Sequence, residues 1–141
     1  MGITIESKNV SADLGFGGFS KFRQKVACLC GEKFSEHYQK LNSTIFLIGK
    51  ERKDFFKKYD AETEALIKES IITAEIANFC YQSDCGGSIS QNQAKQIYEV
   101  VKNYDDDLSY GYSGREDGTV FSDLKNIFED CVKNGGEVKW S

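Results

Sequence analysis

The stretch that decides the fold class is SQNQAKQIYEVV, residues 90–101. Ser90 and Gln93 form the S-x-x-Q capping box that marks the N-terminus of a helix. The apolar residues that follow recur at helical spacing, namely Ala94, Ile97, Tyr98 and Val101. This period is typical of a helix that buries one face, so we expect an amphipathic helix here.

Similar patterns predict helices on both sides of this stretch. We expect one helix from Lys21, capped by Ser20, and another over residues 33–41. Residues 50–80 form the longest helical region, with Asp60 expected to cap a second segment and so to split the region near Tyr59. Gly86 and Gly87 are expected to end this region. The last helix should begin near Ser122 and stop at Asn134-Gly135-Gly136.

The ends of the chain carry the strand signals. Residues 3–5, Ile-Thr-Ile, alternate and are β-branched, and residues 138–140, Val-Lys-Trp, form a second short candidate that we expect to pair with them. Residues 13–19 are interpreted as a glycine-rich loop. We therefore predict a mainly α (α+β) domain, 1–141, with about five helices and a small two-stranded β element from the termini.

The composition is that of one globular domain. The chain has 141 residues, of which 40% are hydrophobic and 28% charged, and it contains no proline. Its apolar runs, such as residues 45–48, are far shorter than the ~20 residues that a membrane helix needs. The N-terminus lacks the basic region and apolar core of a secretory signal, so we expect a cytoplasmic protein whose cysteines are reduced.

Acidic side chains are concentrated in the second half of the chain. Residues 1–79 carry 12 basic and 11 acidic side chains, whereas residues 80–141 carry 6 and 11. The acids are densest at Asp105, Asp106, Asp107, Glu116 and Asp117. Such a surface repels nucleic acid and attracts a basic partner, although a solvated loop explains the same residues.

Tyr110, Tyr112 and Arg115 lie on a glycine-flexed loop within this acidic region. Tyrosine and arginine dominate the binding energy of many protein interfaces, so the loop is a candidate for partner binding. The alternative is that the tyrosines pack over the core while Arg115 pairs with a neighbouring acid.

A zinc site is the candidate for metal binding. Cys80 and Cys85 flank a predicted loop that lets the chain fold back, Asp84 adds an oxygen and His37 adds the chain's one imidazole. Zinc accepts such mixed sulfur, nitrogen and oxygen ligands. The alternative is that Cys30, Cys80 and Cys131 are small buried hydrophobic residues.

No complete catalytic constellation is visible. One histidine and five cysteines give no local hydrolase signature, and the nucleophile-elbow motif is missing. We therefore expect a protein that binds rather than an enzyme. A sponge or enzyme for a nucleotide signal is an alternative function, because the glycine-rich loop precedes Lys21 and Arg23 and Arg115 offers a further phosphate ligand. A small structural metal-binding protein is another alternative.

The chain also resembles small proteins of Gram-positive bacteria and their phages. The resemblance rests on residues 81–87 (YQSDCGG), 104–106 (YDD), 110–115 (YGYSGR) and 121–125 (FSDLK), ending near Trp140, with similar text in the N-terminal loop and residues 19–38. Among proteins of this kind, the chain looks like the anti-CRISPR inhibitors of streptococcal phages, at least one of which is a metalloprotein.

This resemblance implies a specific function. The protein would bind a type II-A RNA-guided nuclease in the cytoplasm of the infected host and block its engagement of nucleic acid. That nuclease uses many Lys and Arg side chains to hold its nucleic acids, which an acidic loop can cover. The resemblance implies no direct contact with nucleic acid and no membrane, and it allows a structural zinc ion.

Overall fold

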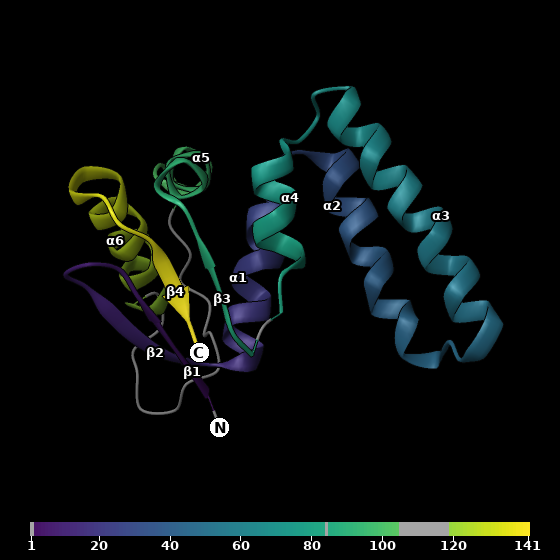
Figure 1. The fold of residues 1–141 in the computed structure, drawn as a ribbon, viewed down its shortest axis with the longest axis horizontal. Helices are drawn as coiled ribbons and strands as arrows, with labels where there is room; N and C mark the ends of the chain where they lie inside the picture. The colour runs from purple at the N-terminus through teal and green to yellow at the C-terminus, as the bar shows by residue number, and fades with distance from the viewer. Residues whose placement is uncertain (1, 84, 105–118) are drawn as a thin grey trace.

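Figure 1 shows the computed structural model, which describes residues 2–83, 85–104 and 119–141. A small antiparallel sheet lies at one side of the molecule and helices cover it. A layer of two further helices, α2 and α3, lies at the opposite side (Figure 1). The prediction of a mainly α fold with some β structure is confirmed.

The sheet has four strands, β1 (Gly2–Glu6), β2 (Ser11–Gly15), β3 (Gly87–Ile89) and β4 (Val138–Trp140), in the order β2-β1-β4-β3. Ile5 pairs with Trp140, so the predicted pairing of the two termini is confirmed. The prediction of only two strands is wrong, because β2 and β3 extend the sheet at its edges. β2 includes residues 13–15, which the glycine content had suggested were part of a loop.

The helices are α1 (Phe16–Leu29), α2 (Glu32–Gln39), α3 (Gly49–Lys68), α4 (Ala74–Tyr81), α5 (Gln91–Val101) and α6 (Thr119–Asn134), with a 3₁₀ helix, η1 (Lys40–Phe46), between α2 and α3. The capping box at the start of α5 is present, with the Ser90 hydroxyl accepting from the Gln93 amide and the Gln93 side chain accepting from Ser90. Ala94, Ile97 and Val101 of the apolar stripe predicted for α5 are buried, and α6 ends at Asn134, as the stop at Asn134-Gly135-Gly136 predicted. These local signals therefore placed both helices correctly.

Aromatic rings form the centre of the core between the sheet and α1, α4 and α6. Phe22 stacks on Phe128 with 5.7 Å between ring centroids, and Phe19 lies 5.3 Å from the Trp140 ring. Phe79 contacts both groups edge-on. Each of these rings is at most 2% exposed, so the core fixes α1 and α4 against β4.

Two predicted helix boundaries are wrong. α1 begins at Phe16 rather than at Lys21, because β2 leads directly into it. α3 runs unbroken through Asp60, whose side chain is exposed and does not cap a new segment. The break occurs instead after Lys68, where Ser70 adopts a φ of 60° and Thr73 caps α4 by accepting from the Ile76 amide.

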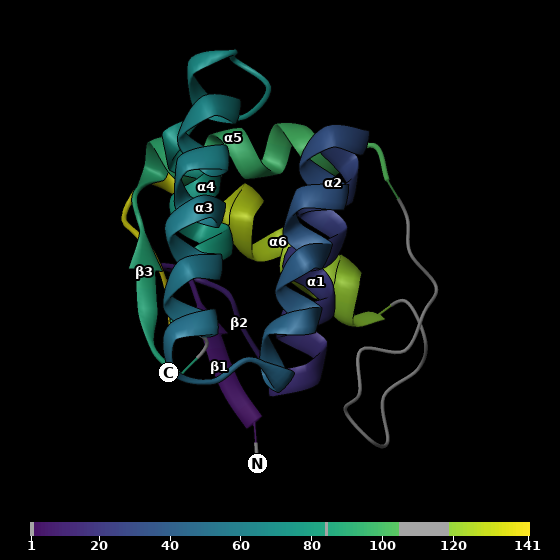
Figure 2. The same ribbon diagram turned by 90° about the vertical axis from the view of Figure 1, so that its right-hand side faces the viewer.

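Helices α2 and α3 and the connecting η1 form an arm, residues 32–68, at one side of the molecule. Figures 1 and 2 show α2 and α3 running side by side as the outermost layer, with α3 at the edge in Figure 1. Tyr59 is the one buried residue of α3, a helix of 20 residues. α3 therefore contacts the rest of the protein along one narrow face, and most of its surface is exposed.

Candidate functional site

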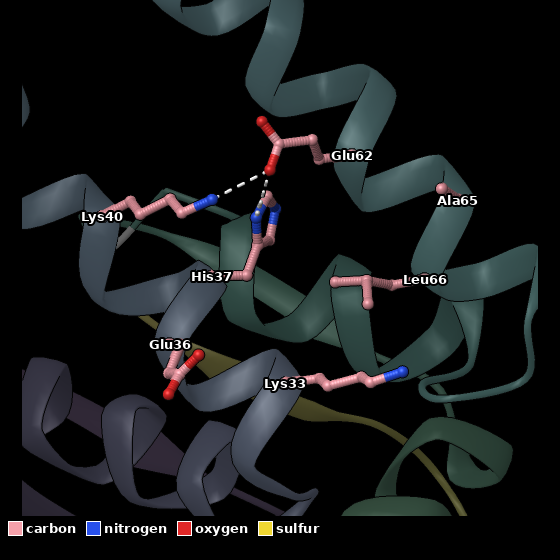
Figure 3. A pocket seen from close by; sticks show the side chains of 7 residues that line it. All are labelled: Lys33, Glu36, His37, Lys40, Glu62, Ala65 and Leu66. Atoms are coloured by element: carbon pink, nitrogen blue, oxygen red, sulfur yellow. Dashed lines mark hydrogen bonds and ion pairs between the residues drawn. The ribbon is translucent and has the colours of Figure 1, made fainter.

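A groove between α2 and α3 is the first candidate site among the described residues (Figure 3). Its volume is about 300 Å³. Lys33, Glu36, His37 and Lys40 line it from α2, and Glu62, Ala65 and Leu66 line it from α3. Residues three and four apart share one helix face, so the spacing of these residues is what brings them to one groove.

His37 forms the floor of this groove and is only 4% exposed. Its Nε2 lies 2.7 Å from the Thr63 hydroxyl. That hydroxyl donates its single proton to the Tyr59 carbonyl at 3.0 Å. Thr63 must therefore accept from His37, which assigns the proton of the neutral imidazole to Nε2.

The second imidazole nitrogen, Nδ1, faces the charged wall of the groove. It lies 3.8 Å from a carboxylate oxygen of Glu62, which also binds the Lys40 ammonium at 2.9 Å (Figure 3). Burial lowers the pKa of His37, Glu62 opposes this shift and Lys40 adds to it. The hydrogen bond from Lys40 lowers the pKa of Glu62. At neutral pH the groove therefore presents an imidazole lone pair beside an ionised carboxylate.

This arrangement suits binding better than turnover. The Thr63 hydroxyl proton is committed to a backbone carbonyl, so His37 is not placed to activate Thr63 as a nucleophile. The lone pair on Nδ1 can accept a hydrogen bond from a ligand, and Lys33 and Lys40 can pair with an anionic group. The groove was not predicted from the sequence, although Lys33, His37 and Lys40 at helical spacing are a usable signal.

The arm ends in an apolar surface, which we call the tip: Ile45, Phe46 and Ile48. These side chains are 77%, 84% and 79% exposed, respectively. Arg52 braces the tip, since its guanidinium donates to the Thr44 carbonyl at 3.0 Å and lies 5.1 Å from the centre of the Phe56 ring. Large apolar side chains exposed together at the end of a projection are typical of a protein interface.

The proposed zinc ligands are not gathered in the part of the chain that the structure describes. His37 lies in the groove with Nε2 bound to Thr63, Cys80 is buried in α4, and Cys85 is exposed beyond it. No three His, Cys, Asp or Glu side chains come together as a metal site among these described residues. Asp84 lies outside them, and a bound zinc ion stays a prediction.

Three of the cysteine thiols have pKa values that favour the protonated form. Burial raises the pKa of Cys30 to about 11. Burial also raises the pKa of Cys80, with Cys30 adding to the shift and Arg23 opposing it, and it raises the pKa of Cys131. All three side chains pack in or against the hydrophobic core, as the alternative interpretation expected.

The eight residues predicted to bind a partner lie outside the described residues: Asp105, Asp106, Asp107, Tyr110, Tyr112, Arg115, Glu116 and Asp117. Their role stays a prediction from the sequence.

Arg23, a candidate phosphate ligand, instead has a structural role. It is 8% exposed, and its guanidinium donates to the carbonyls of Gln82 at 2.6 Å and Phe79 at 3.3 Å. These carbonyls lie at the C-terminal end of α4, where backbone acceptors lack helical partners. Arg23 therefore ties α1 to the end of α4 and is not available to a nucleotide.

Asp130 is a second buried charge that the sequence pattern did not reveal. Its carboxylate accepts from the Ser7 hydroxyl at 2.6 Å, the Asn9 amide at 2.8 Å and the Asn134 side chain at 2.7 Å. These donors hold the pKa of Asp130 well below its usual range. The residue fixes the β1–β2 turn to α6 and has a structural explanation.

Comparison with family models, curated proteins and solved structures gives no match to this chain. No helix among the described residues is both long and apolar enough to cross a membrane.

Proposed function

We propose that the protein acts by binding a macromolecular partner, and that this partner is a type II-A RNA-guided nuclease, which it inhibits without catalysis. The observation that carries the binding function is the arm with its exposed tip. Burying Ile45, Phe46 and Ile48 would release apolar surface from water, which is the main favourable term in protein association. The resemblance to phage inhibitors supplies the class of partner.

The acidic loop supports the choice of a basic partner. Residues 80–141 carry 11 acidic and 6 basic side chains, and five of the acids fall between residues 105 and 117. The nucleases of type II-A systems hold a heteroduplex in a positively charged channel. An acidic loop that enters this channel competes with nucleic acid by covering its Lys and Arg side chains.

Co-elution with the guide-loaded nuclease tests this proposal. We expect a complex in size-exclusion chromatography, and we expect Asp105→Lys, Asp106→Lys and Asp107→Lys together to weaken it by at least about tenfold, because like charges then face each other. The matched control reverses three exposed acids elsewhere, Glu6→Lys, Glu51→Lys and Glu99→Lys. Equal weakening by the control would overturn specific docking through the loop.

A small anionic ligand is the second candidate, and the groove favours it. Lys33, His37 and Lys40 line the groove from one face of α2, with Lys40 directed toward Glu62 and His37 (Figure 3). A cyclic nucleotide would pair its phosphate with the ammonium groups of Lys33 and Lys40 and would donate a hydrogen bond to Nδ1 of His37. A thermal-shift series with cyclic nucleotides tests this, and the loss of any shift in Lys33→Glu would support it. The absence of a shift with every nucleotide would exclude it.

A structural zinc ion is a separate proposal. Elemental analysis of protein purified without a metal-affinity tag would give near-stoichiometric zinc if Cys80, Asp84, Cys85 and His37 form a site. Cys85→Ser should then lower the zinc content, whereas Cys28→Ser, at another exposed thiol, should not. Substoichiometric zinc that neither substitution changes would end this proposal.

A further inference from the structure

The outward face of α3 carries four charged residues in one stripe. Lys53, Lys57, Asp60 and Glu64 are spaced four, three and four residues apart, which places them on one side of the helix. All four side chains are exposed. A different side of α3 packs against α2 through Tyr59 and Thr63. Figure 1 shows no other described segment beyond α3 on the side away from α2.

Two of the neighbouring pairs in this stripe are unfavourable within a single α3 helix. Lys53 and Lys57 are like charges four residues apart, and so are Asp60 and Glu64, and such pairs destabilise a helix, whereas Lys57 and Asp60, three residues apart, attract each other. The basic pair also lies nearer the helix N-terminus and the acidic pair nearer the C-terminus, which opposes the helix dipole. None of the four side chains takes part in an ion pair within the described residues.

The same order is complementary to a second copy of itself. If two α3 helices lie antiparallel with a twofold axis between Lys58 and Tyr59, then Lys53 faces Glu64 of the partner subunit. In that register Lys57 faces Asp60 of the partner subunit, and the symmetry repeats both contacts. One register thus satisfies all four charges of each copy.

The tip fits this register as well. The end of one arm reaches the end of α3 in the other copy, where Ile67 and Ile71 are only half-buried. Contact with these residues would cover Phe46 and Ile48, which are 84% and 79% exposed in the single chain. Exposed ion pairs contribute little affinity individually, so the apolar tip provides the attraction and the charges set the register.

We propose that the protein forms a twofold-symmetric homodimer in which the α3 helices pair antiparallel through the stripe Lys53, Lys57, Asp60 and Glu64, with each tip covering the far end of the other arm. This inference shares the tip with the proposed function, so the homodimer and the nuclease complex would exclude each other at Phe46 and Ile48, and the test of the homodimer uses the protein alone.

Sedimentation equilibrium of the full chain tests the dimer. We expect a dimer mass that shifts toward monomer as the salt concentration rises, since salt screens exposed charges. Lys53→Glu with Lys57→Glu should weaken the dimer by at least about tenfold, because four attractive contacts become repulsive. Asp60→Lys with Glu64→Lys should do the same. Phe46→Ser with Ile48→Ser should also weaken it.

Mixing the two charge-reversed variants provides the decisive control. Each variant repels itself, but one carries acids where the other carries bases, so the mixture should form a heterodimer about as tightly as the original protein. Lys8→Glu with Lys95→Glu makes the same change in net charge at exposed positions away from α3 and should leave the dimer intact. A monomeric original protein, or charge variants that still dimerise, would overturn the proposal. Failure of the mixture to re-form a dimer would overturn the antiparallel register.

Discussion

The imidazole of His37 lies parallel to the ring of Tyr59, with 3.9 Å between the ring centroids and 12° between the planes. His37 belongs to α2 and Tyr59 to α3, so this stack holds the two helices of the arm together. The Tyr59 hydroxyl also lies 2.7 Å from the Tyr81 hydroxyl of α4. Tyr59 therefore contacts both α2 of the arm and α4 of the body of the protein.

Removing the Tyr59 hydroxyl should loosen the arm. Tyr59→Phe keeps the ring stack but deletes the bond to Tyr81, which should cost about 1 kcal/mol. We expect amide hydrogen exchange across α3 to accelerate about fivefold, while α6 exchanges as before. Tyr98→Phe is the control, because its hydroxyl contacts Glu129 at the surface. Unchanged exchange in α3 would show that Tyr59 does not anchor the arm through this bond.

The arm should also become less stable in mild acid. Burial lowers the pKa of His37 below its ordinary value of about 6.5, so the unfolded chain binds a proton more readily than the folded one. The stability linked to neutral His37 is complete above about pH 6.5 and is lost as the pH falls toward the lower folded pKa.

His37→Gln should remove this dependence, because glutamine keeps an N–H donor for Thr63 and does not titrate. Denaturant unfolding from about pH 5 to about pH 8 measures how the free energy of unfolding depends on pH. Identical pH slopes for the original protein and His37→Gln would rule out His37 as the source.

The ionised carboxylate of Asp130 should also stabilise the fold, so acid should destabilise the protein at this residue as well as at His37. Its pKa is held well below the usual range by Ser7, Asn9 and Asn134, so the stability it contributes is present above the unfolded value of about 3.9. This stability is lost as the pH falls through the folded pKa. Asp130→Asn should lower the denaturation midpoint at neutral pH, and Asp123→Asn, on the same helix, should lower it less. Equal effects of the two substitutions would contradict the role of this carboxylate.

Two adjacent glycines should respond differently to alanine. A Cβ at Gly87 would lie 2.6 Å from the Trp140 ring and 2.5 Å from the Gln82 side-chain oxygen. Trp140 is packed in the core and has no free space, so Gly87→Ala should cost about 1–3 kcal/mol. At Gly86 the nearest atom is the Trp140 carbonyl at 3.7 Å, an ordinary contact, so Gly86→Ala should be tolerated. Thermal unfolding of the two variants tests this, and equal losses of melting temperature in Gly87→Ala and Gly86→Ala would contradict it.

Local signals predicted the elements that carry them. The capping box at Ser90 and Gln93 and the stop of α6 at Asn134-Gly135-Gly136 depend on residues near one another in the chain, and both are confirmed. The strands at the termini were found by their β-branched residues. β3 has only three residues, with two of them Gly87 and Ser88, and so it offered no strand pattern of its own.

Features that depend on distant residues could not be predicted in this way. The continuity of α3 through Asp60 follows from packing against α2, which overrides the capping preference of an aspartate. Arg23 gave no sign in the sequence that it would bind the carbonyls at the end of α4, 56 and 59 residues away. The exposure of residues 45–48 was hidden for the same reason, since an apolar run of this kind usually indicates a buried segment.

Target-DNA cleavage by a guide-loaded type II-A nuclease, titrated with this protein, tests the central claim most directly. The proposed function predicts that cleavage falls with increasing protein when the protein is added before the DNA, and falls much less when the DNA is bound first. Such dependence on the order of addition is expected of an inhibitor that competes with nucleic acid. Unchanged cleavage in a large molar excess of the protein, across several such nucleases, would contradict the claim.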